Sequence, residues 1–208
     1  MPRKKTPLRA EVLNQAIVCF ARAGYEGVSM RDLAAASGVS ATALYYHFKD
    51  KEDLYVAAVS QAFKENTRPL WAVLNQDINP WHRLEALVLA LTELLAREEK
   101  FLRLLQWVML DQYQKRQLKL ADEAFRDLFQ AMNALIEELG SSLEPHALTV
   151  SILGMIVFPF ETETTRRFLP GYQPQGETPS NRARHIITVL RQGILPQADT
   201  PRTGWIKT

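Results

Sequence analysis

The sequence has a single cysteine, Cys19, among its 208 residues. An intramolecular disulfide and a zinc site built from several cysteines are therefore excluded. The sequence also lacks a long apolar run. The most apolar stretch, around residues 148–160, is interrupted by threonine, serine, glycine and proline and is too short to span a bilayer. No apolar segment of the signal-peptide type follows Met1, so we expect a cytoplasmic protein without a membrane partner.

The sequence has little net charge, +2 in total, but this charge is unevenly distributed. Residues 1–51 contain eight basic and four acidic residues, a net charge of +4, which leaves −2 for the remainder. A basic head on a slightly acidic body indicates a polyanionic partner for the head. The alternative is a solvated basic surface. Arg3, Lys4 and Lys5 are likewise either a flexible arm that adds salt-dependent affinity or a solvated tail.

Hydrophobic residues recur at helical spacing along the whole chain, and no segment alternates with period two. The first helix is expected to present Leu13, Ala16, Ile17 and Phe20 on one face, with Cys19 in the core, and to end at Gly24. Further helices are expected over residues 80–98, 101–113, 117–139, 145–168 and 180–195, with a loop over 171–179. The pattern predicts an all-α fold of about nine helices.

The segment from Val28 to Asp50 shows closely spaced helix start and stop signals. Ser29 and Asp32 predict a capping box, and Gly38 predicts a turn before a third helix capped by Ser40. A short helix, a turn and a second short helix form the helix-turn-helix pattern. Leu44 is expected to face the core. The outer face of the third helix then presents small or hydrogen-bonding side chains, which in a DNA major groove can approach base edges.

This segment resembles the DNA-binding domain of the tetracycline-repressor (TetR) family of bacterial regulators. The matching stretches are Ala16–Phe20 with Gly24-Tyr25, Val28–Ala34, and Gly38–Leu54 with its run Leu-Tyr-Tyr-His-Phe-Lys-Asp-Lys. The resemblance implies an Ω-shaped homodimer that binds a double-stranded, pseudopalindromic DNA operator and is released by an unidentified small-molecule effector. The expected domains are a DNA-binding domain (1–55), a ligand-binding and dimerisation domain (56–195) and a flexible tail (196–208).

The resemblance also implies which residues contact DNA. Helix two would contribute Ser29, Met30 and Arg31, and the recognition helix Ser40, Ala41, Thr42 and Ala43 toward the bases, with Tyr45, Tyr46, His47 and Lys51 toward phosphates or thymine methyls. Ala41 and Ala43 are smaller than the residues common there, which favours apolar contact or shape readout. Alternatives remain open. Tyr45 and Tyr46 could pack inside the domain, His47 could merely end its helix, and Lys51 could be an ordinary solvated lysine. Lys51 lies at a helix N-terminus that disfavours a cation, which a phosphate would offset.

The C-terminal part is rich in aromatic and sulfur-containing side chains, which predicts an internal pocket for an apolar or aromatic effector. The expected pocket residues are Trp71, Phe101, Trp107, Met109, Tyr113, Phe125, Phe129, Met155 and Phe158. The two last helices are expected to form the dimer interface, since residues 148–158 are apolar on nearly all sides. The expected contact residues are Ile152, Gly154, Ile156, Ile187, Leu190 and Ile194.

Two other classes of function fit the sequence less well. An enzyme is disfavoured because the sequence has no nucleophile elbow, glycine-rich phosphate loop or metal-ligand motif, and its four histidines are far apart. We therefore expect no catalytic residues, no metal and no cofactor. The other rival is a helix-turn-helix adaptor that binds protein instead of DNA and has no effector. The basic head and the Tyr-Tyr-His-Phe run disfavour it.

Overall fold

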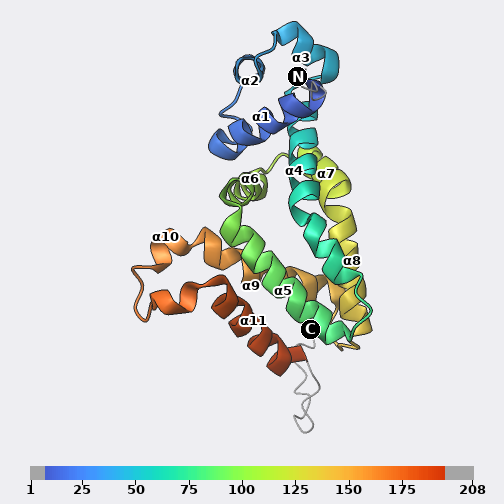
Figure 1. Cartoon of the computed structure of the whole chain (residues 1–208), viewed down its shortest axis with the longest axis vertical. Helices are drawn as coiled ribbons and strands as arrows, with labels where there is room; N and C mark the ends of the chain where they lie inside the picture. The colour runs from blue at the N-terminus through green and yellow to red at the C-terminus, as the bar shows by residue number, and fades with distance from the viewer. Residues whose placement is uncertain (1–7, 195–208) are drawn as a thin grey trace, which may run out of the picture.

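The computed structural model describes residues 8–194, and every regular element in that range is helical (Figure 1). The all-α prediction is confirmed. No helix in the described range is long and apolar enough to cross a membrane. The helices are α1 (Leu8–Ala23), α2 (Met30–Ser37), α3 (Ala41–His47), α4 (Lys51–Leu74), α5 (Pro80–Arg97), α6 (Glu99–Leu110), α7 (Gln114–Leu120), α8 (Arg126–Glu138), α9 (Pro145–Glu161), α10 (Glu163–Arg166) and α11 (Pro179–Ile194).

Helices α1–α3 lie at one end of the molecule, and α4 runs from them along the remaining helices, the body (Figure 1). The expected domain boundary after residue 55 falls inside α4, which is continuous across it. The first turns of α4 pack on α1, because Leu54, Tyr55 and Ala58 are buried there with Phe20. The later turns pack on α5. One continuous helix therefore packs against both the small domain and the body, whose buried residues form a single hydrophobic cluster.

The body differs from the predicted helix pattern between residues 114 and 139. A single helix from Gln117 to Leu139 was expected, but the structure has α7, a π-helical turn over Ala121–Phe125, and then α8. The π turn accommodates Phe125, whose ring packs edge-on against the Phe63 ring of α4 with 4.9 Å between the two ring centres. Such turns are a tertiary adjustment that helical periodicity does not reveal. Gly140 ends this region with φ +65°, as expected for a helix C-terminus.

The predicted helix over residues 145–168 is also shorter than expected. Helix α9 ends at Glu161, two residues after Pro159, and the single-turn α10 follows. The expected loop over 171–179 contains a 3₁₀ turn at Pro174–Glu177. Helix α11 packs along α5 and α9. The predicted tail over 196–208 lies outside the described residues.

Candidate nucleic-acid interface and internal cavity

The helix-turn-helix is built by the local signals that its sequence predicts. The Ser29 hydroxyl oxygen accepts a hydrogen bond from the Asp32 N–H at 3.2 Å, and the Asp32 carboxylate accepts one from the Ser29 N–H at 3.0 Å. Gly38 turns the chain with φ +67°, and Ser40 accepts from the Ala43 N–H at 3.1 Å. The capping box, the turn and the second cap are therefore confirmed, and together they set the angle at which α3 leaves α2.

Helix α3 divides into a buried side and an exposed side. Leu44 and the following Phe48 are buried to 0% and 1% exposure, and they anchor the helix to the domain core. Tyr45 and Tyr46 are 54% and 86% exposed, so neither packs into the core. The other candidate contact residues of α2 and α3 that are exposed or half-buried are Ser29, Met30, Arg31, Ser40, Ala41, Thr42, Ala43 and His47. None of these side chains is fully buried, so all of them stay accessible to a partner.

Lys51 has a partner that the sequence did not predict. Its ammonium donates a hydrogen bond to the Tyr25 carbonyl at 3.0 Å and lies 4.0 Å from the centre of the Tyr25 ring. A carbonyl oxygen and an aromatic face both stabilise a cation beside a helix N-terminus. From the sequence, a phosphate was expected to offset this unfavourable position. In the structure Tyr25 supplies that stabilisation within the chain.

Trp107 lies at the junction between the small domain and the body, not in the expected internal pocket of the body. Its indole N–H donates to the Ala21 carbonyl at 3.2 Å. A Cβ placed on Gly24 would lie 2.7 Å from the Trp107 ring, so the close approach of α6 to the end of α1 requires a glycine. Gly24 also has φ +67°, which glycine tolerates best. The expectation was wrong because an aromatic at helical spacing packs equally well between domains.

A second set of contacts at this junction is centred on Arg116 of α7, which sequence reasoning missed. The guanidinium carbon lies 3.6 Å from the centre of the Tyr25 ring, and the guanidinium forms two hydrogen bonds to the Asp111 carboxylate. Arg116 is 5% exposed. Burial raises the pKa of Asp111, but the Arg116 and Tyr113 hydrogen bonds and the Arg116 charge outweigh it and leave that pKa below its usual value. No sequence pattern distinguishes Arg116 from the polar residues around it.

The body contains a partly open apolar cavity of about 350 Å³ between α4, α5, α6, α7, the π turn, α8 and α9. Of the nine residues predicted to line a pocket, Phe101, Met109, Phe125 and Phe129 line this cavity. The other five do not: Trp107 and Tyr113 lie near the domain junction, Trp71 packs against the core, and Met155 and Phe158 line a surface hollow beside α11. The lining that the prediction missed is mostly aliphatic, for example Leu91, Leu105 and Leu153. Aliphatic residues at helical spacing also fill the cores of proteins without a ligand cavity, so the sequence did not mark these residues as cavity lining.

The predicted dimer residues do not all face outward. Ile152, Ile156 and Leu190 are buried within the chain at 0%, 1% and 3% exposure, so they are core residues and that part of the prediction was wrong. Gly154 is exposed and Ile187 is half-buried, whereas the side chain of Ile194 lies outside the described residues. The exposed apolar stripe of α9 is instead formed by Val150, Gly154 and Phe158, spaced four residues apart. When a helix is apolar on all sides, its sequence does not predict which side is buried within the protomer and which side stays exposed.

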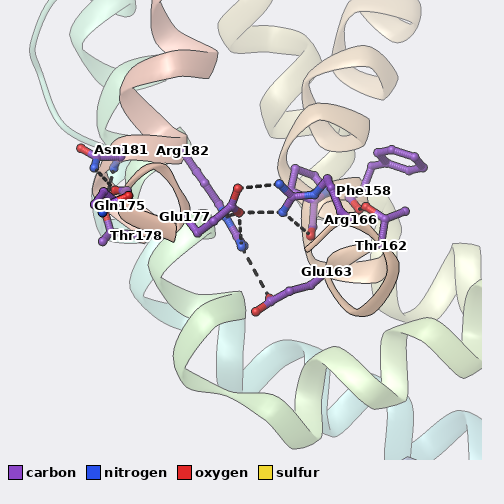
Figure 2. A network of polar contacts seen from close by, with 10 residues as sticks. Phe158, Thr162, Glu163, Arg166, Gln175, Glu177, Thr178, Asn181 and Arg182 are labelled. Carbon is purple, nitrogen blue, oxygen red and sulfur yellow. Dashed lines mark hydrogen bonds and ion pairs between the residues drawn. The ribbon is translucent and has the colours of Figure 1, made fainter. Parts of the chain in front are cut away.

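The segment between α9 and α11 is held by the ion-pair network shown in Figure 2. Both Glu177 oxygens accept hydrogen bonds from Arg166 at 2.6 Å, and Glu177 also binds Arg182 at 2.8 Å. Glu163 lies 3.5 Å from Arg182. The Arg166 hydrogen bonds lower the pKa of Glu177 to about 2, with a further contribution from Arg182 that burial partly opposes. This network holds the segment between α9 and α11 in place beside the exposed stripe of α9.

The small domain contains a segment that matches a known protein family. Residues 12–58 match the family described as bacterial regulatory proteins, tetR family. The HTH-type transcriptional repressor AcnR of Corynebacterium glutamicum is 48% identical over 54 residues, 26% of this chain and 29% of AcnR. The repressor BepR of Brucella suis is 31% identical over 93 residues, 44% of each chain. The matched regions thus span less than half of these curated relatives.

Two solved structures share the fold over most of the chain. The transcriptional regulator FadR from Bacillus subtilis, solved in complex with stearoyl-CoA, has a TM-score of 0.74 at 16% identity and covers 89% of this chain and 99% of its own. AibR, solved with isovaleryl coenzyme A and operator DNA, has a TM-score of 0.67 at 20% identity and covers 88% and 97%. The resemblance is confirmed for residues 12–58, which match the tetR family, and the described chain shares the fold of these two regulators.

Proposed function

We propose that this protein is a DNA-binding transcriptional repressor whose operator affinity is controlled by a small molecule. The observation that carries the proposal is the exposed face of α3. Two caps and the buried Leu44 and Phe48 hold this helix rigidly, with two exposed tyrosines, in a domain whose residues 12–58 match the tetR family. Rigid presentation of small and aromatic groups on a short helix suits insertion into a major groove.

The individual DNA contacts follow from position on this face. The start of α3, from Ser40 to Ala43, would lie against base edges, and Tyr45, Tyr46 and His47 against the backbone or thymine methyls. Ser29, Met30 and Arg31 at the start of α2 would bind phosphate. Lys51 has three N–H donors, and the Tyr25 carbonyl accepts from one, so a phosphate contact is compatible with its position.

The same proposal includes a homodimer formed through α9 and α11. The stripe of Val150, Gly154 and Phe158 is apolar and exposed, and Val189 of α11 is exposed as well. A Cβ placed on Gly154 meets nothing within 4 Å inside the chain, so no neighbour in the protomer requires a glycine there. A second copy packed on this stripe would bury it and place two recognition helices on a pseudopalindromic site.

The effector would occupy the apolar cavity of the body. FadR and AibR, which share the fold, were solved with stearoyl-CoA and isovaleryl coenzyme A. The cavity here is lined almost wholly by apolar side chains, which fits an apolar effector. A regulator of this kind works in the cytoplasm of a bacterium, where its DNA is.

The experiment that tests the proposal is selection of bound genomic fragments by the full chain at near-physiological salt, followed by footprinting. An inverted repeat with half-sites one helical turn apart is expected. Replacement of both Tyr45 and Tyr46 by alanine should weaken binding to the recovered fragment at least tenfold, since a groove contact contributes about 1–3 kcal/mol. The matched control is Phe168→Ala, which removes an equally exposed ring from the body. Recovery of random fragments, or equal loss in both variants, would contradict the proposal.

A further inference from the structure

The cavity of the body has very little polarity. Of the described residues that line it, Thr67 and Gln117 alone are polar, and none is charged. The Thr67 hydroxyl donates to the Phe63 carbonyl of its own helix at 2.8 Å. A ligand with a formal charge inside this cavity would lose its hydration without gaining an opposite charge, which is strongly unfavourable. The lining therefore selects a neutral ligand.

Gln117 is the cavity residue whose hydrogen-bond donors are used to hold the turn between α6 and α7. Its side-chain amide nitrogen donates to the Val108 carbonyl at 2.7 Å and to the Asp111 carbonyl at 2.6 Å. The Val108 carbonyl also accepts from the Asp111 N–H at 3.3 Å, so it keeps a partner if Gln117 leaves. Exchange of this one bond for a ligand carbonyl therefore leaves no buried acceptor unpaired and costs little.

The turn that Gln117 holds is the one that orients Arg116. Asp111 is in this turn, and its carboxylate accepts hydrogen bonds from the Arg116 guanidinium and from the Tyr113 N–H. Arg116 in turn stacks on the Tyr25 ring between α1 and α2, and Lys51 at the start of α4 holds the Tyr25 carbonyl. A continuous set of contacts thus runs from the cavity to the base of the helix-turn-helix.

We infer that the cavity binds a neutral, apolar molecule with one carbonyl oxygen, such as a ketone, an ester or a thioester, and that Gln117 both binds this oxygen and transmits its presence through Arg116 to Tyr25. This inference rests on the proposed function, since it names the ligand class and the coupling route of the same regulator. Gln117 contacts the ligand, whereas Arg116 is a positioning residue. When Gln117 exchanges its Val108 bond for the ligand, the turn between α6 and α7 loses one of the two bonds that Gln117 gives it, and Arg116 holds the orientation of the small domain less firmly.

The ligand class is tested by calorimetric titration of the full chain with 2-decanone, methyl nonanoate and decanoate. Both neutral probes should bind at least tenfold more tightly than decanoate, and their ratio distinguishes a ketone from an ester site. Gln117→Leu should weaken 2-decanone binding about fivefold, the value of one neutral hydrogen bond. The matched control is Gln130→Leu on the exposed face of α8, which should have no effect. Equal affinity for decanoate, no binding of either neutral probe, or an unchanged Gln117→Leu would overturn the assignment.

The coupling is tested by repeating the 2-decanone titration with the protein saturated by its recovered DNA fragment. In the unmodified chain DNA should lower the probe affinity about tenfold, a typical coupling between linked sites. Arg116→Met should bind the probe normally without DNA, and its ratio of probe affinity without DNA to probe affinity with DNA should be near one. Arg103→Met, on the exposed side of α6, should keep the tenfold ratio of the unmodified chain. A full ratio in Arg116→Met would overturn the coupling route. Failure to recover a specific DNA fragment would overturn the proposed function instead. The titrations of the three probes without DNA would still test the ligand class.

Discussion

Replacement of Gly24 by alanine perturbs the junction between the small domain and the body at one defined point. Gly24 has φ +67°, and a Cβ there would lie 2.7 Å and 2.8 Å from two atoms of the Trp107 ring. Two separate costs follow. The backbone must hold a left-handed conformation with a side chain, and the indole must move away from α1, which strains its hydrogen bond to the Ala21 carbonyl.

The two costs can be estimated separately. A left-handed residue other than glycine costs about 1–2 kcal/mol, and insertion of a methyl group into a packed contact costs about 1–3 kcal/mol. Gly24→Ala should therefore lower the free energy of unfolding by about 2–5 kcal/mol. Gly38 and Gly140 have φ +67° and +65°, with nothing within 4 Å of an added Cβ. Alanine at either position should cost only the backbone part, about 1–2 kcal/mol.

Urea unfolding of the three variants, followed by circular dichroism, measures these differences. Trp107→Ala completes a double-mutant cycle with Gly24→Ala, and the double variant should be more stable than the sum of the single losses predicts, because the clash is then absent. If Gly24→Ala costs no more than Gly140→Ala, or if the cycle is additive, the packing of Trp107 on Gly24 is refuted.

Three further outcomes are expected. The pKa of the Glu177 carboxylate is lowered to about 2, so this group should contribute up to about 3 kcal/mol to the free energy of unfolding above pH 4.5, and this contribution should be lost as the pH falls toward 2. Glu177→Gln should flatten this part of the curve of unfolding free energy against pH, while Glu161→Gln at an exposed position should not. Gly154→Trp should leave the protomer folded but give monomers in light scattering and weak operator binding, and a dimer that persists would place the interface elsewhere. Cys19 is buried, and burial raises the pKa of its thiol, so a thiol reagent should modify it much more slowly in the folded chain than in the urea-unfolded chain; rapid modification of the folded chain would contradict its core position.

Local signals in the sequence predicted the small domain well. The Ser29–Asp32 capping box, the Gly38 turn and the Ser40 cap all depend on residues within four positions of one another, and each is present as predicted. The buried position of Leu44 follows from helical periodicity in the same way. The surface position of α3 was thus predictable, because it is determined by short-range contacts and one simple pattern.

Contacts between distant segments were not predictable in this way. Trp107 and Arg116 meet Gly24 and Tyr25 more than eighty residues away, and nothing near either residue distinguishes a junction contact from a core or surface position. The inward orientation of Ile152 and Ile156 likewise depends on which neighbours α9 receives.

The sequence by itself determined the all-α class and the helix-turn-helix with its buried Leu44, since each follows from caps, turns and hydrophobic spacing within short segments. Only the tertiary structure decided which apolar side chains enclose the cavity, which face of α9 stays exposed, and how Gln117 and Arg116 connect the cavity to Tyr25. The physical reason is that burial and hydrogen-bond partners are properties of packed pairs of helices. A single helix with apolar residues on every side is compatible with several such packings.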